Sequence, residues 1–178
     1  IKEHSNDKLS PDMIREIHSL ISHDTLDDTK YEGMFRDDNS IAVRDAFTGE
    51  TYHDPPNFNR IPDLIKALCD FANDDSVFVH PIVKGIVLHF VLAYIHPFMD
   101  GNGRVSRSLF YWYLMRNGYA SVEYISISKV MKSHRGKYDN AYLLSETDGN
   151  DITYFINYNL DMIFEAADAF LSYIRRKI

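Results

Sequence analysis

The chain of 178 residues has little cysteine, no long apolar run and fewer basic than acidic residues. Its one cysteine, Cys69, cannot form a disulfide within the chain, which excludes a disulfide-stapled scaffold and is typical of a reducing compartment. No apolar run reaches the roughly 20 residues that a membrane helix needs, because Lys84 and His89 interrupt the longest candidate, residues 82–95. The N-terminus does not resemble a signal peptide either. We therefore expect no membrane partner and a cytoplasmic location.

The composition is that of an ordinary globular protein with an acidic charge balance. Lys and Arg number 19 and Asp and Glu number 26, so the net charge is −7. An acidic chain is unfavourable for nucleic acid, and no direct nucleic-acid binding is expected. Hydrophobic residues make up 45%, which excludes a disordered chain, and the length suits one domain over residues 1–178. The chain does not begin with Met, and we expect a missing segment upstream.

Most apolar residues recur at helical spacing. Ser10 before Pro11 and Asp12 is typical of a helix start, because a hydroxyl can cap the first N–H groups and proline is favourable in the first turn. Apolar residues surround the helix expected over about 81–95 on nearly all sides, which predicts a buried central helix. Further helices are expected over about 62–72, from the break at 100–102 to the stop signal Asn117-Gly118, over about 134–145 and over about 152–175.

Residues 26–53 depart from this helical pattern. Residues 26–40 are rich in Asp, Thr, Gly and Asn, which predicts a loop. Residues 41–53 place β-branched and aromatic residues on both sides of Thr48-Gly49, which predicts a short hairpin that ends before Pro55-Pro56. The fold class expected is therefore mostly α with one short β-hairpin.

The residues suited to chemistry gather in the segment 96–107, His-Pro-Phe-Met-Asp-Gly-Asn-Gly-Arg-Val-Ser-Arg. His96 follows the most buried helix, and a histidine with an ordinary pKa of about 6.5 can take a proton from a hydroxyl near neutral pH. Asp100 supplies a carboxylate, a ligand that Mg²⁺ prefers. These two residue types suit a base beside a metal-assisted phosphate site.

The second half of the segment is suited to binding phosphate. Gly101-Asn102-Gly103 can bring backbone N–H groups close to an anion, in front of the positive end of the next helix. Arg104 and Arg107 are three positions apart, so both can lie on one helical face and clamp phosphate oxygens. The whole segment therefore predicts a polyphosphate site with a base beside it, as needed to transfer a phosphate-containing group to a hydroxyl.

Two other phosphate-binding motifs are excluded. A helix rather than a strand precedes Gly101-Asn102-Gly103, so the context of a dinucleotide-binding fingerprint is absent. The chain also lacks the Gly-x-x-x-x-Gly-Lys-Ser/Thr sequence of a P-loop.

The segment resembles the motif His-x-Phe-x-Asp/Glu-Gly-Asn-Gly-Arg-x-x-Arg of the Fic (Fido) family and matches every fixed position. Family-like residues elsewhere extend the resemblance over most of residues 10–165: Gly33 to Arg36, Pro55-Pro56, His80-Pro81 and Asp151 to Phe155. The resemblance implies a single Fic-type helical domain, with its core over about 10–165 and a β-hairpin flap over the active site. It also implies protein AMPylation, the Mg²⁺-dependent transfer of AMP from ATP to a Ser, Thr or Tyr hydroxyl of a target protein with release of pyrophosphate.

The resemblance assigns a role to each residue of the segment. His96 is implied as the general base, Phe98 as a core anchor and Asp100 as the Mg²⁺ ligand. The other matched residues are implied as the phosphate-binding group: Gly101, Asn102, Gly103, Arg104 and Arg107. Doc-like kinases of the wider family carry Lys in place of Gly103, so this glycine favours AMP transfer over phosphate transfer.

Outside the segment the implied roles compete with simpler structural ones. Thr51, Tyr52 and His53 resemble the flap that holds the target by strand pairing, or belong to an ordinary surface hairpin. Tyr138 and Tyr142 line the adenosine pocket, or fill the core. His89 and Cys69 are expected in the core. Members of the family are often dimers, so a homodimer is a further expectation.

Three alternatives to AMP transfer from ATP remain open at this point. The same site could remove AMP from a protein, it could use another donor such as UTP or CDP-choline, or the domain could bind a nucleotide or partner without catalysis.

Many Fic proteins also carry an inhibitory motif, Ser/Thr-x-x-x-Glu-Gly/Asn, and no Ser or Thr of this chain has Glu four residues later. We therefore expect the inhibitory glutamate in the upstream segment or on a partner chain, and this chain to be less inhibited than its parent.

Overall fold

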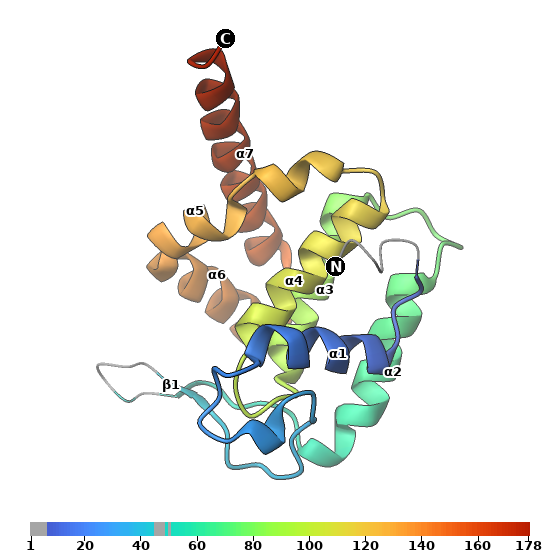
Figure 1. Ribbon diagram of the computed structural model, residues 1–178. Coiled ribbons are helices and arrows are strands. Elements are labelled where there is room, and N and C mark those ends of the chain that lie inside the picture. The colour runs from blue at the N-terminus through green and yellow to red at the C-terminus, as the bar shows by residue number, and fades with distance from the viewer. Residues whose placement is uncertain (1–6, 45–48, 50) are drawn as a thin grey trace.

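The computed structural model describes residues 7–44, 49 and 51–178, which form a mostly helical fold with one small sheet (Figure 1). The helices are α1 (Pro11–Ser22), α2 (Ile61–Asn73), α3 (Pro81–Ile95), α4 (Asn102–Arg116), α5 (Ile127–Ser133), α6 (Arg135–Thr147) and α7 (Thr153–Arg175). Short 3-10 turns lie at η1 (Thr29–Tyr31), η2 (Phe58–Arg60) and η3 (Ala120–Tyr124). The expectation of a mostly α fold with a short hairpin is confirmed.

Local signals in the sequence set several helix ends. The Ser10 side chain accepts a hydrogen bond from the Met13 N–H at 3.2 Å and caps α1, with Pro11 as its first residue. At the other end of the bundle, α4 stops before Gly118, which adopts a positive φ of 87°. The short helix α5 and the turn η3 were not expected from the sequence.

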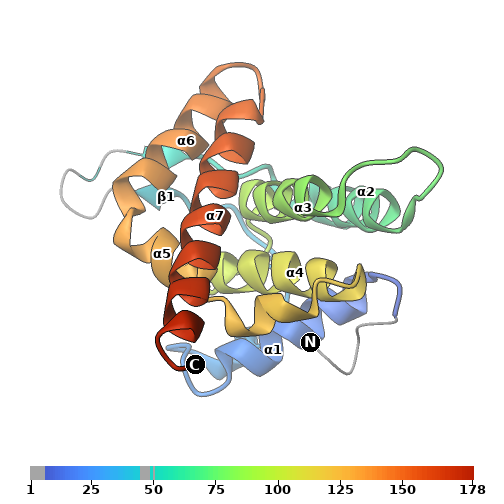
Figure 2. The ribbon, with the colours of Figure 1, turned by 90° about the horizontal axis from the view of Figure 1, so that it is seen from above.

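Helix α3 lies at the centre, between α2 and α4, and α1 packs on the far side of α4 (Figure 2). Ile86, Leu88, Leu92 and Ile95 of α3 are fully buried, as the all-round apolar pattern predicts. Its two sides belong to different cores. One core joins α3 to α1, α2 and α4, and the other joins α3 and α4 to α5, α6 and α7. The C-terminal end of α3 is therefore held from several directions.

The hairpin consists of β1 (Val43–Arg44) and β2 (Thr51–His53), which pair antiparallel. Val43 lies opposite His53 and Arg44 opposite Thr51, with a register irregularity between the two pairs. Thr48, at the expected tip, lies outside the described residues, whereas Gly49 has a positive φ of 72°. The hairpin brings β2 to the same end of the molecule as the C-terminal end of α3.

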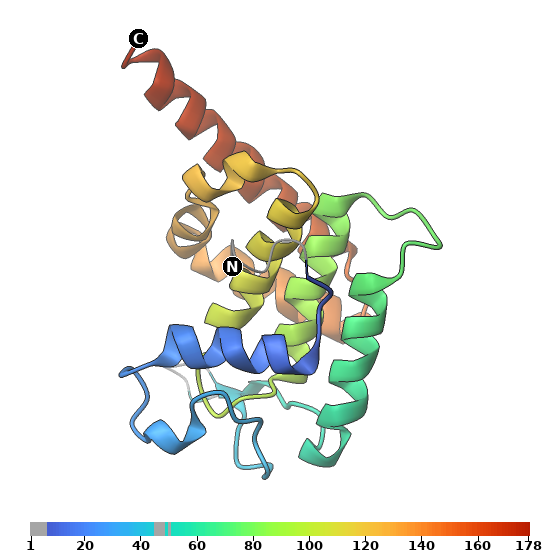
Figure 3. The ribbon, with the colours of Figure 1, turned by 45° about the vertical axis from the view of Figure 1, so that its right-hand side comes forward.

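Helix α7 is the longest helix, and its C-terminal half projects beyond the other helices (Figure 3). Phe155 near its start is fully buried, whereas Phe164 is 77% exposed. In the described part of the chain, no helix combines the length and the apolar character that crossing a bilayer requires.

Candidate active site

His96 ends helix α3 in a left-handed backbone conformation, with φ 48° and ψ 57°. Its N–H still donates to the Leu92 carbonyl at 3.1 Å, so the side chain leaves the helix directly after its last turn. A positive φ at a residue with a side chain is unfavourable and requires support from its surroundings. The loop that follows, residues 96–101, is called the motif loop below.

The His96 ring is set up as a neutral base. Nδ1 lies 3.1 Å from the Ala93 carbonyl oxygen, and a carbonyl can only accept, so Nδ1 carries the proton and Nε2 has the free lone pair. Burial lowers the pKa of His96 to about 4, and repulsion from His53 and Arg36 acts in the same direction. His96 is therefore uncharged at neutral pH, and Nε2 can accept a proton.

Arg36 holds the backbone of the motif loop from outside. Its side chain is only 3% exposed, and its Nε donates to the His96 carbonyl at 2.9 Å. Its own N–H donates to the Pro97 carbonyl at 2.8 Å. Its two Nη atoms donate to the carbonyls of Asp38 and Pro56, which flank the hairpin. One buried guanidinium thus ties the left-handed turn at His96 to both ends of the flap region.

His18 of α1 supports the same loop from the opposite side. Its Nδ1 accepts from the Gly33 N–H at 2.9 Å, so Nε2 carries the proton that it donates to the Asp100 carbonyl at 3.0 Å. The ring also stacks on Phe98, with centroids 3.8 Å apart and planes 7° apart. Burial lowers the pKa of His18, which favours the neutral ring that both hydrogen bonds require. Sequence reasoning did not identify His18 as a support of the motif loop.

Asn102 closes the motif loop from within. Its Oδ1 accepts from the Phe98 N–H at 2.9 Å and its Nδ2 donates to the Phe98 carbonyl at 2.8 Å. Both residues are buried, and Phe98 is fully so. The Asn102 amide, which we expected in the phosphate cradle, is therefore used inside the protein, and only its backbone N–H is left for an anion.

The start of α4 provides a cradle of N–H groups next to Asp100. Gly101 has a positive φ of 79° and precedes α4, whose first N–H groups have no acceptor within the helix. Its own N–H donates to Asp100 Oδ1 at 2.5 Å. The Asp100 side chain is 71% exposed, with Oδ2 at 3.3 Å from Arg104 Nη2. This arrangement places a carboxylate beside a helix N-terminus that favours anions.

The two arginines of the segment have different surroundings. Arg104 Nη1 donates to the Ile21 carbonyl at 3.0 Å and to Thr25 Oγ1 at 2.6 Å, so this side chain also joins α4 to the end of α1. Within the described residues, Arg107 makes no side-chain hydrogen bond or ion pair. A Cβ on Gly103 would lie 3.2 Å from Arg107 Nη1. Glycine at this position therefore leaves space for a guanidinium that is available to bind an anion.

A pocket of about 760 Å³ lies between the hairpin and helices α3, α4, α5 and α6. It brings together seven of the expected site residues: Tyr52, His53, His96, Gly103, Arg107, Tyr138 and Tyr142. The remaining five do not line it: Thr51, Asp100, Gly101, Asn102 and Arg104. Sequence reasoning missed four charged residues of its wall: Lys129, Lys132, Arg135 and Asp139. Lys129 and Lys132 lie on the unexpected helix α5, so no helical pattern pointed to them.

His53 anchors the hairpin, and its side chain does not face outward to a target. It is 3% exposed, with Nε2 at 2.7 Å from the Tyr94 carbonyl and Nδ1 at 2.7 Å from Glu146 Oε1. Because the carbonyl only accepts, Nε2 donates to it, and Glu146 Oε1 lies against Nδ1. The His53 side chain thus attaches β2 to α3 and α6, and strand pairing of a target with Thr51, Tyr52 and His53 stays a prediction. Tyr52 and Thr51 remain exposed on β2.

Tyr138 combines the two roles that the sequence left open. It lines the pocket, yet its ring stacks on the fully buried His89 with centroids 5.9 Å apart, and its hydroxyl lies 3.4 Å from His89 Nε2. Burial raises the pKa of Tyr138 to about 12 and lowers that of His89 to about 3. Both groups are therefore uncharged at neutral pH, and His89 is a core residue as expected.

The comparisons with known proteins point to one family. The Fic/DOC family matches residues 8–114. The protein adenylyltransferase Fic of Aedes aegypti is 35% identical over 120 residues, 67% of this chain and 22% of that protein. Its counterpart in Drosophila melanogaster is 32% identical over 67% of this chain and 23% of that protein. The chain thus spans about a fifth of the length of these curated relatives.

Solved structures share the fold over nearly the whole chain. A Fic family protein from Desulfovibrio desulfuricans superposes with a TM-score of 0.77 at 23% identity, over 96% of this chain and 50% of that chain. A Fic domain containing signaling protein from Bacteroides thetaiotaomicron gives 0.62 at 26% identity, over 95% and 66%. With the family match over more than half of its length, this chain belongs to the Fic/DOC family.

Proposed function

We propose that this chain transfers AMP from ATP to a Ser, Thr or Tyr hydroxyl of a target protein and releases pyrophosphate. One observation carries the proposal: His96, neutral and with a free lone pair on Nε2, lines the same pocket as Gly103 and Arg107, whose guanidinium has no hydrogen-bond partner among the described residues. A base and an anion site thus border one space. Relatives named protein adenylyltransferase support this choice of reaction.

In the proposed reaction His96 Nε2 takes the proton of the target hydroxyl as its oxygen attacks the α-phosphorus of ATP. A new bond forms between that oxygen and the α-phosphorus, and the bond from the α-phosphorus to the bridging oxygen breaks. Pyrophosphate leaves with the bonding electrons. A general base at this step contributes about 100-fold to 10,000-fold in rate.

The triphosphate is proposed to lie at the start of α4. The first N–H groups of the helix and the positive end of its dipole favour a phosphate there, and Arg107 adds a second point of attachment. Arg104 is held beside Asp100 and contributes positive charge from the far side of the cradle. Fixing the charged donor next to His96 provides the positioning and charge stabilisation that phosphate chemistry requires.

Mg²⁺ is proposed as the cofactor, and Asp100 is the residue that would hold it. Mg²⁺ is often bound through one carboxylate together with substrate phosphates, and the exposed Asp100 carboxylate next to the α4 cradle fits that pattern. Among the described residues, His, Cys, Asp and Glu side chains form no group of three that could hold a metal. The donor set thus fits a metal that binds together with ATP. Bound Mg²⁺ would neutralise phosphate charge.

The proposal is tested by incubating the chain with Mg²⁺ and ATP labelled at either the α- or the γ-phosphate. We expect covalent label on protein from α-labelled ATP only, and a loss of at least about 100-fold in His96→Ala. His23→Ala, which removes an exposed histidine of α1's C-terminal flank, serves as the matched control and keeps its activity. Label from γ-labelled ATP would instead show phosphate transfer. No label from either donor, with ATP binding intact, contradicts the proposed reaction.

A homodimer and a cytoplasmic location stay predictions for this chain. Light scattering during size-exclusion chromatography measures the first, and microscopy of the tagged protein in its host measures the second.

A further inference from the structure

Two lysines on α5, Lys129 and Lys132, lie at the wall of the pocket and have no partner in the part of the chain that the structure describes. They are three residues apart, so they lie on one face of the helix, and both line the pocket with exposed side chains. Within the described residues, neither makes a hydrogen bond or an ion pair. Some other lysines are paired, as Lys66 is with Asp70 at 2.5 Å and Lys30 with Asp28 at 2.8 Å. What sets Lys129 and Lys132 apart is their place at a cavity, where two cations without partners among the described residues, in a chain with net charge −7, indicate an anionic ligand.

The other charges of the pocket wall already have partners or roles. Arg135 pairs with Asp139 at 3.7 Å, and both residues line the pocket. Arg107 and the start of α4 bind the triphosphate in the proposed function, and His96 is neutral. The α5 lysines are therefore additional positive charge, on a different helix from the phosphate cradle.

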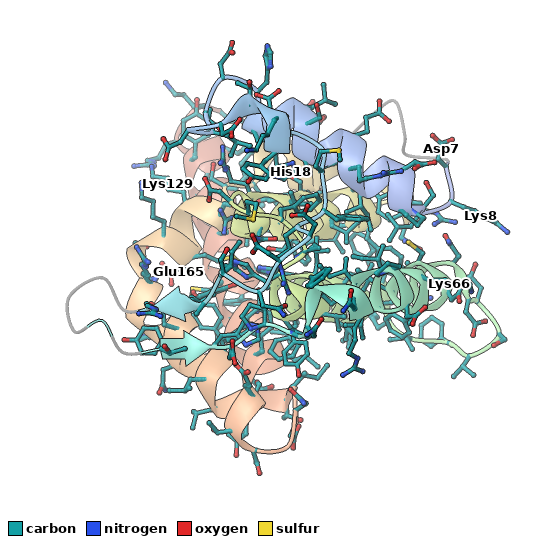
Figure 4. All side chains as sticks on the ribbon, turned by 90° about the horizontal axis from the view of Figure 1, so that it is seen from below. Asp7, Lys8, His18, Lys66, Lys129 and Glu165 are labelled. Carbon is teal, nitrogen blue, oxygen red and sulfur yellow. The ribbon has the colours of Figure 1, made fainter. Side chains whose placement is uncertain are left out.

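The hairpin indicates which anion would reach these lysines. Val43 and Tyr52 of the hairpin line the same pocket, and Lys129 lies at the side of the molecule to which the hairpin extends (Figure 4). A target segment added to a strand edge has side chains i and i+2 on the same face, roughly 7 Å apart. If the target hydroxyl faces His96, the side chains two positions away face the same pocket.

We propose that Lys129 and Lys132 form a subsite that selects target segments carrying Asp or Glu two residues from the modified hydroxyl. The inference rests on the proposed function, since it names the class of segment that the transferase accepts. Both lysines are exposed at the edge of the pocket, so they attract an acidic side chain through solvent. The preference for acidic segments therefore weakens as the salt concentration rises.

The test uses two short fluorescent peptides, each with a central serine flanked two residues away on both sides by Glu in one peptide and Gln in the other. Binding is measured by anisotropy at low salt, without turnover, and AMP transfer is measured with α-labelled ATP. We expect the Glu peptide to bind about threefold to tenfold more tightly, the range that two partly exposed ion pairs supply. The ratio of the two AMP-transfer rates should favour the Glu peptide by a similar factor.

Two double variants each remove two positive charges, one from the pocket wall and the other from a distant surface. In Lys129→Gln with Lys132→Gln, we expect the Glu-to-Gln ratio to approach one. The control combines Lys8→Gln with Lys66→Gln, which lie on the side of the molecule away from the hairpin (Figure 4) and should keep the wild-type ratio. An equal fall of the ratio in both double variants would show a general charge effect and overturn the subsite.

Two further outcomes separate this inference from the proposed function. A raised KM for ATP in Lys129→Gln with Lys132→Gln, with an unchanged peptide ratio, would assign the lysines to a donor phosphate and overturn the inference. If wild type modifies neither peptide, the proposed function fails for these peptides, and the anisotropy ratio alone still decides whether the subsite exists. Equal binding of the Glu and Gln peptides by the wild-type chain overturns the proposed subsite.

Discussion

The motif loop and the wall formed by α5 and the hairpin border one pocket, but they are held in different ways. Arg36, His18 and Asn102 fix the motif loop through buried hydrogen bonds to its backbone. On the α5 side, Lys129 and Lys132 are exposed and make no such bonds within the described residues. A reacting group must keep its geometry, whereas a recognition surface gains from side chains that adapt. The difference assigns chemistry to the loop and selectivity to the opposite wall.

The firm support of the motif loop has a reason in its backbone. Non-glycine His96 adopts a left-handed conformation, and Gly101 has a positive φ. The left-handed conformation of His96 is unfavourable unless the surroundings stabilise it. Two buried side chains from earlier in the chain, Arg36 and His18, and one from directly after the loop, Asn102, provide that support, so removing one of them should affect far more than one contact.

Loss of Asn102 should therefore have the largest effect on stability. Asn102→Ala removes both partners of the buried Phe98 backbone, and we expect a loss of about 2–4 kcal/mol in the free energy of unfolding. Urea denaturation measures this value. Asn140→Ala, at an exposed position on α6, is the matched control and should stay within about 0.5 kcal/mol. A loss below about 1 kcal/mol for Asn102→Ala would show that the loop does not depend on this side chain.

The pH dependence tests whether the environment of the motif loop keeps His96 neutral. With the pKa of His96 lowered to about 4, AMP transfer should not lose its base between pH 8 and 5, and should fall about tenfold per unit below 4. Initial rates at constant ionic strength measure the profile. An acid limb centred near the ordinary value of 6.5 would mean that the ring is not buried as described.

The same lowered pKa predicts how stability varies with pH. Between pH 4 and 6.5 the unfolded chain binds a proton at His96 that the folded chain does not, so the free energy of unfolding falls as pH falls through this window; the loss from His96 is complete below pH 4 and absent above 6.5. Fully buried His89, with a pKa lowered to about 3, acts in the same direction. Urea midpoints at pH 5 and 7.5 measure the change, and His96→Asn should reduce it.

Gly103→Ala should separate stability from binding at the start of α4. Alanine favours a helix over glycine by up to about 1 kcal/mol, so stability should be unchanged or higher. Its Cβ would crowd Arg107 Nη1, and we expect the KM for ATP to rise several-fold. Gly136→Ala in α6, where a Cβ meets no atom within 4 Å, should raise stability without changing KM. An unchanged KM in Gly103→Ala would remove Arg107 from the phosphate site.

Tyr52→Ala should give the smallest effect, because it changes the recognition side of the pocket. Tyr52 is 36% exposed on β2, so we expect stability to change by no more than about 0.5 kcal/mol. Peptide modification should fall modestly through a higher KM for the peptide, with kcat retained. A fall in kcat alone would show that Tyr52 acts in the chemical step. The division between a chemical role for the motif loop and a recognition role for the α5 and hairpin side would then be wrong.

Much of the fold could be predicted because its signals are local. Ser10 before Pro11 started α1, and the stop at Asn117-Gly118 ended α4 within a residue or two of the expected place. Helix α5 could not be predicted in this way. It has seven residues, too few to show a periodic pattern, and a helix of this length is stable only through packing, here by Ile127 and Met131 in the core.

By itself the sequence determined the longer helices, the hairpin and the order of the motif residues, because caps, stop signals and a continuous motif are read within a few neighbouring positions. Only the tertiary structure decided which distant residues meet at the site. His18 reaches Asp100 across 82 positions and His53 reaches Glu146 across 93, and no local pattern encodes such pairs. It also turned the Asn102 amide inward and placed Lys129 and Lys132 of α5 at the same pocket as His96 of the motif loop, since these positions follow from how the helices pack and not from any one of them.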